Sequence, residues 1–254
     1  MTRMTHTSIL VFLSALVIGM SVPPGVRAQS APASPNPAST FDLSKKSVTP
    51  IVVPIYKPPV RGAPGGRVGG GTRGGDQTFT LSVLAPNHTA LTGKEQPDLY
   101  WYVSKPISTP IVFTLSDDGA NPVVEQTLAS PFDVGIHRVR LADFGVRLAP
   151  GKQYRWFVSL VSDPKRRSRD ILAGATIELE NPVGAETMPS MQDGRTVETH
   201  RLAETGHWYD AIAILSDEID HHPSEPSLRT QRAGLLQQVG LTEIANFDLN
   251  YRGQ

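Results

Sequence analysis

The chain contains no cysteine among its 254 residues. This absence excludes disulfide bonds, metal sites built on thiolates and catalysis by a cysteine nucleophile. A domain of this chain must therefore be held together by a hydrophobic core of sufficient size.

Excess charge of either sign is also lacking, because 24 basic residues balance 24 acidic ones. The two signs are nevertheless unevenly distributed. Residues 45–75 hold six lysines and arginines and no acid, whereas residues 170–250 hold fourteen acids and four arginines. A basic arm therefore precedes the globular part of the chain, and an acidic region ends it.

Familiar catalytic motifs are missing as well. The sequence has no Gly-x-Ser-x-Gly elbow, no His-Glu-x-x-His zinc pair and no EF-hand loop. The glycine-rich run ending at Gly75 lacks the Lys-Ser/Thr ending of a phosphate loop. His221-His222 and Asp117-Asp118-Gly119 are interpreted as turns rather than as metal ligands. We therefore expect no catalytic residue, no metal, no cofactor and no nucleic-acid partner, and we expect that the protein is not an enzyme.

Long hydrophobic runs are limited to one near the N-terminus. Residues 9–20 are apolar except for Ser14 and Gly19, which is too short a run to span a bilayer. Arg3 precedes this run, and small residues follow at Val26 and Ala28. The pattern predicts a cleavable signal peptide over residues 1–28, cut between Ala28 and Gln29, and hence export to the periplasm or the cell surface. A retained N-terminal anchor is the alternative; after cleavage no transmembrane anchor is expected.

Residues 29–75 are rich in Pro, Ala and Ser and then in Gly and Arg, which predicts a disordered linker. Within it, residues 48–60 alternate prolines with apolar side chains, and these residues either dock as an edge strand or polyproline stretch or stay mobile. Arg67 and Arg73 lie among the glycines, where they are candidates for holding an anionic polymer.

Residues 76–181 consist of short apolar runs separated by turn residues, which predicts an all-β domain. The spacing favours an immunoglobulin-like antiparallel β-sandwich of about seven strands. The predicted strands are 79–84, 99–103, 111–115, 123–128, 136–141, 154–161 and 171–179.

Two of these strands carry most of the aromatic side chains. Alternation places Trp156 in an apolar row that is typical of a core, and it places Tyr100 and Tyr102 on the face opposite Leu99. Exported β-domains bind sugars through exposed aromatic rings, so Tyr100 and Tyr102 are the surface candidates for a binding site.

A basic loop joins the last two predicted strands. It holds Lys165, Arg166, Arg167 and Arg169 within five positions. A solvated hairpin is the simpler interpretation. The alternative is a contact for an acidic partner or for the acidic end of the same chain.

Residues 190–250 change to a helical period. Helices are predicted over 197–204, over 207–220 and from about 224–227 to Val239, ending at Gly240. Gly206, Trp208 and Ala211 have the types and spacing of the second helix of a tetratricopeptide repeat, so we expect a small TPR-like hairpin. One such hairpin cannot bury its own apolar face, and it should dock on the β-domain or on another copy of the chain.

The chain resembles the exported bacterial family called domain of unknown function 928, over roughly residues 61–250. The motifs that carry this resemblance are Arg67-Val-Gly-Gly-Gly-Thr-Arg-Gly74, Leu84-Ala-Pro86, Pro97-Asp-Leu-Tyr-Trp-Tyr-Val103, Gly151-Lys-Gln-Tyr-Arg-Trp-Phe157, Ser162-Asp-Pro164, Gly206-His-Trp-Tyr-Asp-Ala211 and Leu235-Leu-Gln-Gln-Val-Gly-Leu241. The resemblance implies an architecture and an exported compartment but no activity. It also implies a tether between cysteines near positions 76 and 162, and this chain has Asp76 and Ser162 there instead.

These features predict an exported, non-catalytic binding or assembly protein of the cell envelope, whose partner is an envelope protein or an anionic polymer. The alternatives are a carbohydrate-binding module that uses exposed aromatics and a hydrolase of unfamiliar type.

Overall fold

All seven predicted strands are present, each within two residues of its predicted limits. The computed structural model describes residues 51–60, 66–71, 79–162, 165, 166, 168, 170–180 and 192–251, all within the compact unit Thr49–Gln254. The predicted signal peptide and most of the predicted linker lie outside the described residues.

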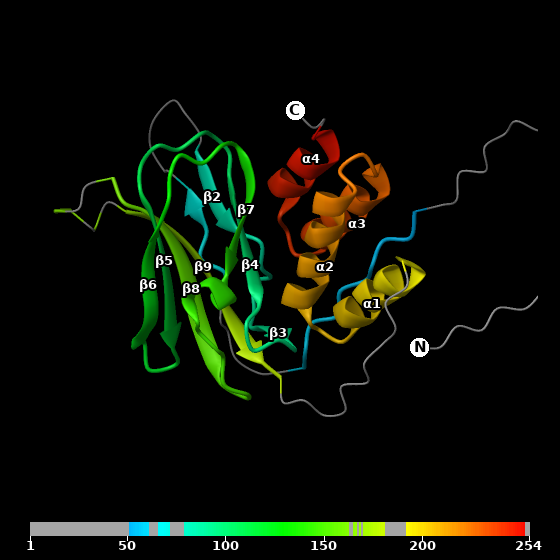
Figure 1. Ribbon diagram of the computed structural model, residues 1–254, viewed down its shortest axis with the longest axis horizontal. Coiled ribbons are helices and arrows are strands. Elements are labelled where there is room, and N and C mark those ends of the chain that lie inside the picture. The colour runs from blue at the N-terminus through cyan, green and yellow to red at the C-terminus, as the bar shows by residue number, and fades with distance from the viewer. Residues whose placement is uncertain are drawn as a thin grey trace, which may run out of the picture. The chain divides into compact units, whose positions relative to one another are not determined.

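The strands form two sheets (Figure 1). The four-stranded sheet has the order β1-β2-β4-β7, with strands Gly70–Gly71, Thr80–Val83, Asp98–Val103 and Gly135–Arg140. The five-stranded sheet has the order β3-β9-β8-β5-β6, with strands Ala90–Thr92, Ile171–Leu179, Gln153–Leu160, Ile111–Asp117 and Pro122–Leu128. We call the two sheets together the β unit. All pairs in it are antiparallel except β3 with β9, which is parallel.

The core of the β unit is built by alternation along the strands. Leu99, Trp101 and Val103 of β4 share one face and are fully buried. Trp156 of β8 is also fully buried, which confirms its prediction as a core residue, and its ring lies 6.5 Å from that of Phe113 in β5. Large rings supply much of the apolar area that a chain without disulfides needs.

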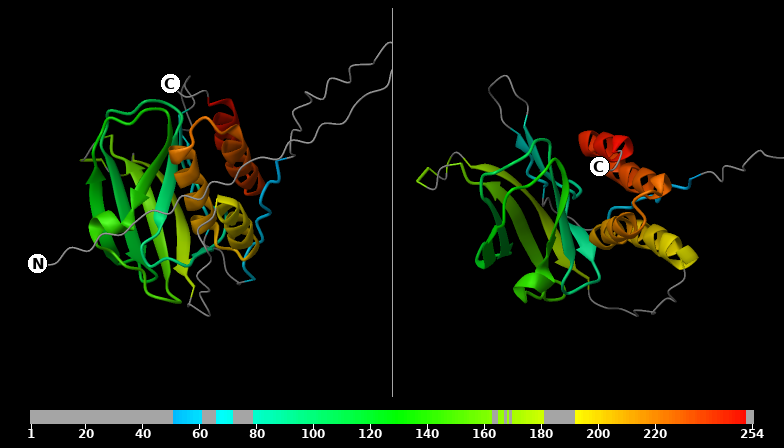
Figure 2. Two further views of the ribbon diagram at one scale, coloured as in Figure 1. Left: turned by 45° about the vertical axis from the view of Figure 1, so that its right-hand side comes forward. Right: turned by 45° about the horizontal axis from the view of Figure 1, so that its top comes forward.

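Four helices follow: Gln192–Glu204 (α1), Trp208–His221 (α2), Pro226–Gln238 (α3) and Thr242–Asn250 (α4). We call them the helical region. Both views of Figure 2 show it on one side of the β unit. The ring of Phe247 in α4 lies 5.3 Å from that of Tyr102 in β4, so the helices cover the outer face of the four-stranded sheet. Of the two docking partners expected for the helices, the chain uses its own β unit.

The first turn of α2 fastens the helical region to both sheets. Trp208 Nε1 donates a hydrogen bond of 2.8 Å to the Leu84 carbonyl beside β2. The hydroxyl of Tyr209 accepts from Trp156 Nε1 at 3.0 Å and donates to the Thr176 carbonyl at 3.1 Å. Because these side chains are buried, the bonds fix the angle at which α2 leaves the β unit.

Four elements were not predicted: β1, β3, the short 3-10 helix Leu141–Phe144 (η1) and α4. β1 and β3 have two and three residues, too few for a visible alternation, and β3 pairs with a strand far along the chain. Helix α4 buries Ile244, Ala245 and Asp248, and the buried carboxylate hides its apolar stripe in the sequence. The coarse prediction of a β-rich part followed by helices is confirmed.

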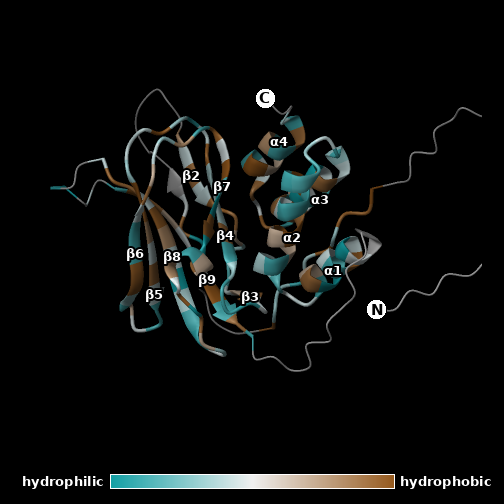
Figure 3. Cartoon of the chain, viewed as in Figure 1, coloured by the Kyte–Doolittle hydropathy of each residue, from teal (hydrophilic) through white to brown (hydrophobic). Residues whose placement is uncertain are grey.

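Residues 51–60 lie against the helices rather than along a sheet edge. Lys57 N donates to the Ala203 carbonyl of α1 at 3.0 Å, and Tyr56 N donates to Gln238 Oε1 of α3 at 2.8 Å. The ring of Tyr56 meets Trp208 edge-on at 4.9 Å. Figure 3 shows the apolar colour of this segment where it runs beside the helices. Residues 51–60 therefore dock, but not as an edge strand.

Candidate functional site: a cavity among three helices

A cavity of about 440 Å³ lies between α1, α2 and the start of α3. Helix α3 can start there because Pro226 occupies its first turn and the Glu225 carboxylate accepts a hydrogen bond from Ser227 N at 3.2 Å. The floor is apolar, with Ile214, Leu215 and Leu228. The volume falls in the range of small-ligand pockets.

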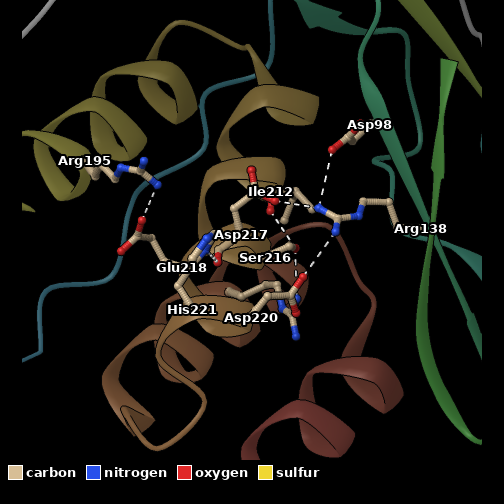
Figure 4. A network of polar contacts seen from close by, with 10 residues as sticks. Asp98, Arg138, Arg195, Ile212, Ser216, Asp217, Glu218, Asp220 and His221 are labelled. Atoms are coloured by element: carbon tan, nitrogen blue, oxygen red, sulfur yellow. Dashed lines mark hydrogen bonds and ion pairs between the residues drawn. The ribbon is translucent and has the colours of Figure 1, made fainter. Parts of the chain in front are cut away.

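Charged side chains from all three helices line the wall. Arg195 of α1 donates to Glu218 Oε1 of α2 (Figure 4), and His222 Nε2 lies 3.9 Å from Glu218 Oε2. Glu225 stands at the start of α3. Its pKa is lowered by the hydrogen bonds from Ser227, with a smaller contribution from His222, so this exposed carboxylate is ionised at neutral pH.

Gln231 completes the wall from α3. Its side chain is only 7% exposed, and its Oε1 has no hydrogen-bond partner within the described part of the chain. A buried acceptor without a donor costs about 1–3 kcal/mol, so native proteins rarely keep one unless water or a ligand satisfies it.

On the other side of α3, Arg232 takes part in a closed polar network. Its Nε and Nη2 donate to the two oxygens of Asp248 in α4 at 2.7 and 2.8 Å, and its Nη1 donates to Ser216 Oγ at 2.9 Å. Arg229 adds a further bond to Asp248 at 3.0 Å. The Asp248 carboxylate is fully buried, and this network holds α2, α3 and α4 together.

A second ionic network joins the helical region to the β unit (Figure 4). Arg138 of β7 donates to Asp217 of α2 at 2.6 Å and to Asp220 at 3.4 Å, and it lies 3.6 Å from Asp98 of β4. Burial raises the pKa of Asp98, and Arg138 opposes that rise. This network is part of the docking surface between the helical region and the β unit.

Asp210, in the first turn of α2, makes a third buried contact. It accepts from Gly93 N at 2.7 Å and from Thr92 Oγ1 at 3.1 Å. Burial raises the pKa of this carboxyl even though both hydrogen bonds act in the opposite direction. The contact fixes the loop after β3 against the helix.

Tyr100 and Tyr102 are not at the surface, and the prediction that they form an exposed binding site is wrong. Each is 4% exposed, because α2 and α4 cover the face of β4 that carries them. Burial raises the pKa of Tyr100 to about 12, although the neighbouring Arg138 opposes the rise. Alternation correctly separated these rings from Leu99 and Trp101, but both faces of β4 turn out to be buried.

The described basic candidates, Arg67, Lys165 and Arg166, lie in two different parts of the molecule. Arg67 Nη1 donates to the Ala85 carbonyl at 2.9 Å and to the Val239 carbonyl at 3.2 Å, so this guanidinium links the β unit to the end of α3. Lys165 and Arg166 are exposed in the loop between β8 and β9, which Figure 1 shows on the side away from the helices. Arg73, Arg167 and Arg169 lie outside the described residues, as do Ala28 and Gln29.

Sequence reasoning missed Gln231 and Glu218. The signal for Gln231 is a polar residue placed between Leu228 and Leu235 on the buried stripe of α3. No comparable signal marks Glu218, because an acid near the end of an amphipathic helix is ordinary.

The part of the chain that the structure describes contains no group of three metal-binding side chains. In the same residues, no helix combines the length and the apolar character needed to cross a membrane.

A protein-family model described as Domain of Unknown Function (DUF928) matches residues 68–249, a range that includes the helical cavity. No curated protein matches the chain.

Proposed function

The chain belongs to the domain of unknown function 928 family, and we propose that it is an exported, non-catalytic binding or assembly protein of the cell envelope. The observation that carries the proposal is the cavity among α1, α2 and α3. Gln231 lines it, and the buried Oε1 of this residue has no hydrogen-bond partner among the described residues. We propose that this cavity receives part of an envelope protein.

The finer fold assignments belong to the same proposal. Two sheets of short, mostly antiparallel strands support an immunoglobulin-like sandwich. The pairing of α1 with α2 around Gly206 and Trp208 supports a TPR-like hairpin.

Binding is better supported than hydrolysis. A hydrolase would use the Glu218 and His222 pair, the carboxylate and imidazole that line the cavity. His222 Nε2 lies 3.9 Å from Glu218 Oε2, which is too long for the hydrogen bond between a base and the group that orients it. One oxygen of Glu218 is also held by Arg195. The carbohydrate-binding alternative is no longer proposed, because its two tyrosines are buried.

The test places a photo-crosslinking residue at Thr196, an exposed position at the cavity in α1, in the full chain produced in its own envelope. We expect one discrete adduct that disappears in the Gln231→Leu background. The matched control carries the crosslinker at Asp118, which lies in the β5–β6 turn. Equal adducts from both positions, or none from Thr196, would count against the proposal.

Export is tested separately, by the N-terminal sequence of the protein recovered from the envelope fraction. We expect it to begin at Gln29. A protein that still begins at Met1 would overturn the proposed cleavage after Ala28.

A further inference from the structure

The cavity presents an acceptor that nothing in the described chain satisfies. Gln231 lines the cavity, and its Oε1 is buried and has no hydrogen-bond partner among the described residues. Thr89, Tyr100 and Trp101 also have a buried polar atom without a partner, but none of these residues lines the cavity. Gln231 alone among these four is therefore placed to meet a ligand, and that ligand must bring an N–H or O–H donor.

The charges of the wall define the ligand further. Two carboxylates, Glu218 and Glu225, face one guanidinium, Arg195, so the wall carries one net negative charge when His222 is neutral. The Arg195 guanidinium is committed to Glu218 Oε1. Glu218 Oε2 lies 3.9 Å from His222 Nε2, and Glu225 Oε1 accepts from Ser227 N. The wall thus carries more negative than positive charge.

The apolar floor sets the remaining requirement. Ile214, Leu215 and Leu228 offer aliphatic contact beside the polar wall, and no phenylalanine, tyrosine or tryptophan is among the described residues that line the cavity. A sugar would find none of these rings to stack on. An alkyl chain that ends in a cation would match both surfaces, because its stem packs on apolar side chains while its head meets the carboxylates.

We propose that the cavity binds an alkylammonium group, whose three N–H donors reach Gln231 Oε1 and the carboxylates of Glu218 and Glu225. This inference rests on the proposed function and specifies its ligand. Two sources share this chemistry: a lysine side chain of an envelope protein, and a free aliphatic amine.

The direct test titrates the full chain with Nα-acetyl-lysine methylamide and follows binding by calorimetry. The matched probe, Nα-acetyl-norleucine methylamide, has the same aliphatic stem without the ammonium. We expect the lysine probe to bind and the norleucine probe to bind at least tenfold more weakly, since hydrogen bonds to charged groups are worth about 1.5–3 kcal/mol. Equal binding of both probes would overturn the inference, and so would no binding of either.

A titration with n-butylammonium distinguishes the two sources of the ammonium group. Binding tighter than that of the lysine probe assigns the cavity to free amines, and weaker binding assigns it to lysine side chains.

Two variants locate the site. Gln231→Leu removes the acceptor at nearly constant volume, and Glu225→Gln removes a charge while keeping an acceptor for Ser227 N. Each substitution should lower the affinity for the lysine probe about tenfold. The control, Gln237→Leu, changes an exposed residue of the same helix and should leave binding unchanged. Unchanged binding in both cavity variants would overturn the assignment of the ammonium to this cavity.

The two proposals can fail separately. A Thr196 adduct that depends on Gln231, together with no binding of the lysine probe, would overturn the ammonium inference and leave the binding function standing. Binding of n-butylammonium that depends on Gln231, with no adduct in the envelope, would support the ammonium inference and overturn the proposed envelope partner.

Discussion

Gln231 and Arg232 are neighbours in α3, and both are buried, yet they face two different environments. Arg232 points to a closed side, where Asp248 and Ser216 accept from every nitrogen of its guanidinium. Gln231 points to an open side, where its oxygen has no partner and a cavity of about 440 Å³ begins.

The difference separates a structural role from a binding role within one helix. Buried polar groups that satisfy one another hold elements together, whereas a buried polar group without a protein partner beside a cavity can bind water or a ligand there. We therefore expect substitutions on the two sides of α3 to change stability and binding differently.

The largest effect is expected on the closed side. Asp248→Asn should lower the free energy of unfolding by about 3–5 kcal/mol, because it leaves the Arg232 guanidinium buried without a counter-charge. Urea denaturation measures the change. Asp220→Asn removes a carboxylate that is 62% exposed from the Arg138 network and should cost no more than about 1 kcal/mol. Equal losses of unfolding free energy in the two variants would show that the buried network around Asp248 contributes no more to stability than the exposed Arg138–Asp220 pair.

The docked residues 51–60 should respond to Gly234→Ala. A Cβ at Gly234 would lie 2.2 Å from Cγ1 of Val53, so the segment must move away from α3. Hydrogen exchange should show the amides of Tyr56 and Lys57 losing protection about tenfold or more, which corresponds to at least about 1.4 kcal/mol of lost docking free energy. The helix itself gains propensity from alanine. Gln237→Ala, which changes an exposed residue of α3, is the control and should leave both amides protected.

Asp210 should make stability depend on pH. Its raised pKa means that the folded protein binds the proton more tightly than the unfolded chain. The free energy of unfolding therefore falls as pH rises from the ordinary pKa of an aspartate to the raised one. Asp210→Asn should remove this fall, and the difference between the two stability curves isolates Asp210 from other carboxyls. Parallel curves would contradict the assignment.

The smallest effect on stability is expected on the open side. Gln231→Leu removes an acceptor that has no partner, so the free energy of unfolding should stay the same or rise by up to about 1 kcal/mol. A loss of more than about 2 kcal/mol in the same urea experiment would mean that Gln231 serves the fold, like Arg232 beside it.

Much of the architecture follows from local sequence patterns. Alternation around Trp101 and Trp156 predicted both strands and the inward side of each, and Gly206 with Pro223 bounded α2 correctly. The covering of Tyr100 and Tyr102 could not be predicted in this way, because it depends on helices that lie more than a hundred residues later in the chain. The cavity could not be predicted for the same reason, because three helices must pack before they bring together Arg195, Glu218 and Gln231.

The most direct test of the central claim is a two-dimensional NMR spectrum that resolves the side-chain amide of Gln231 while Nα-acetyl-lysine methylamide is added to the full chain. We expect the Gln231 signal to shift, together with backbone amides of α1, α2 and the start of α3, while the side-chain signals of Arg232 stay in place. A Gln231 signal that does not move, or shifts confined to the β unit, would contradict the account.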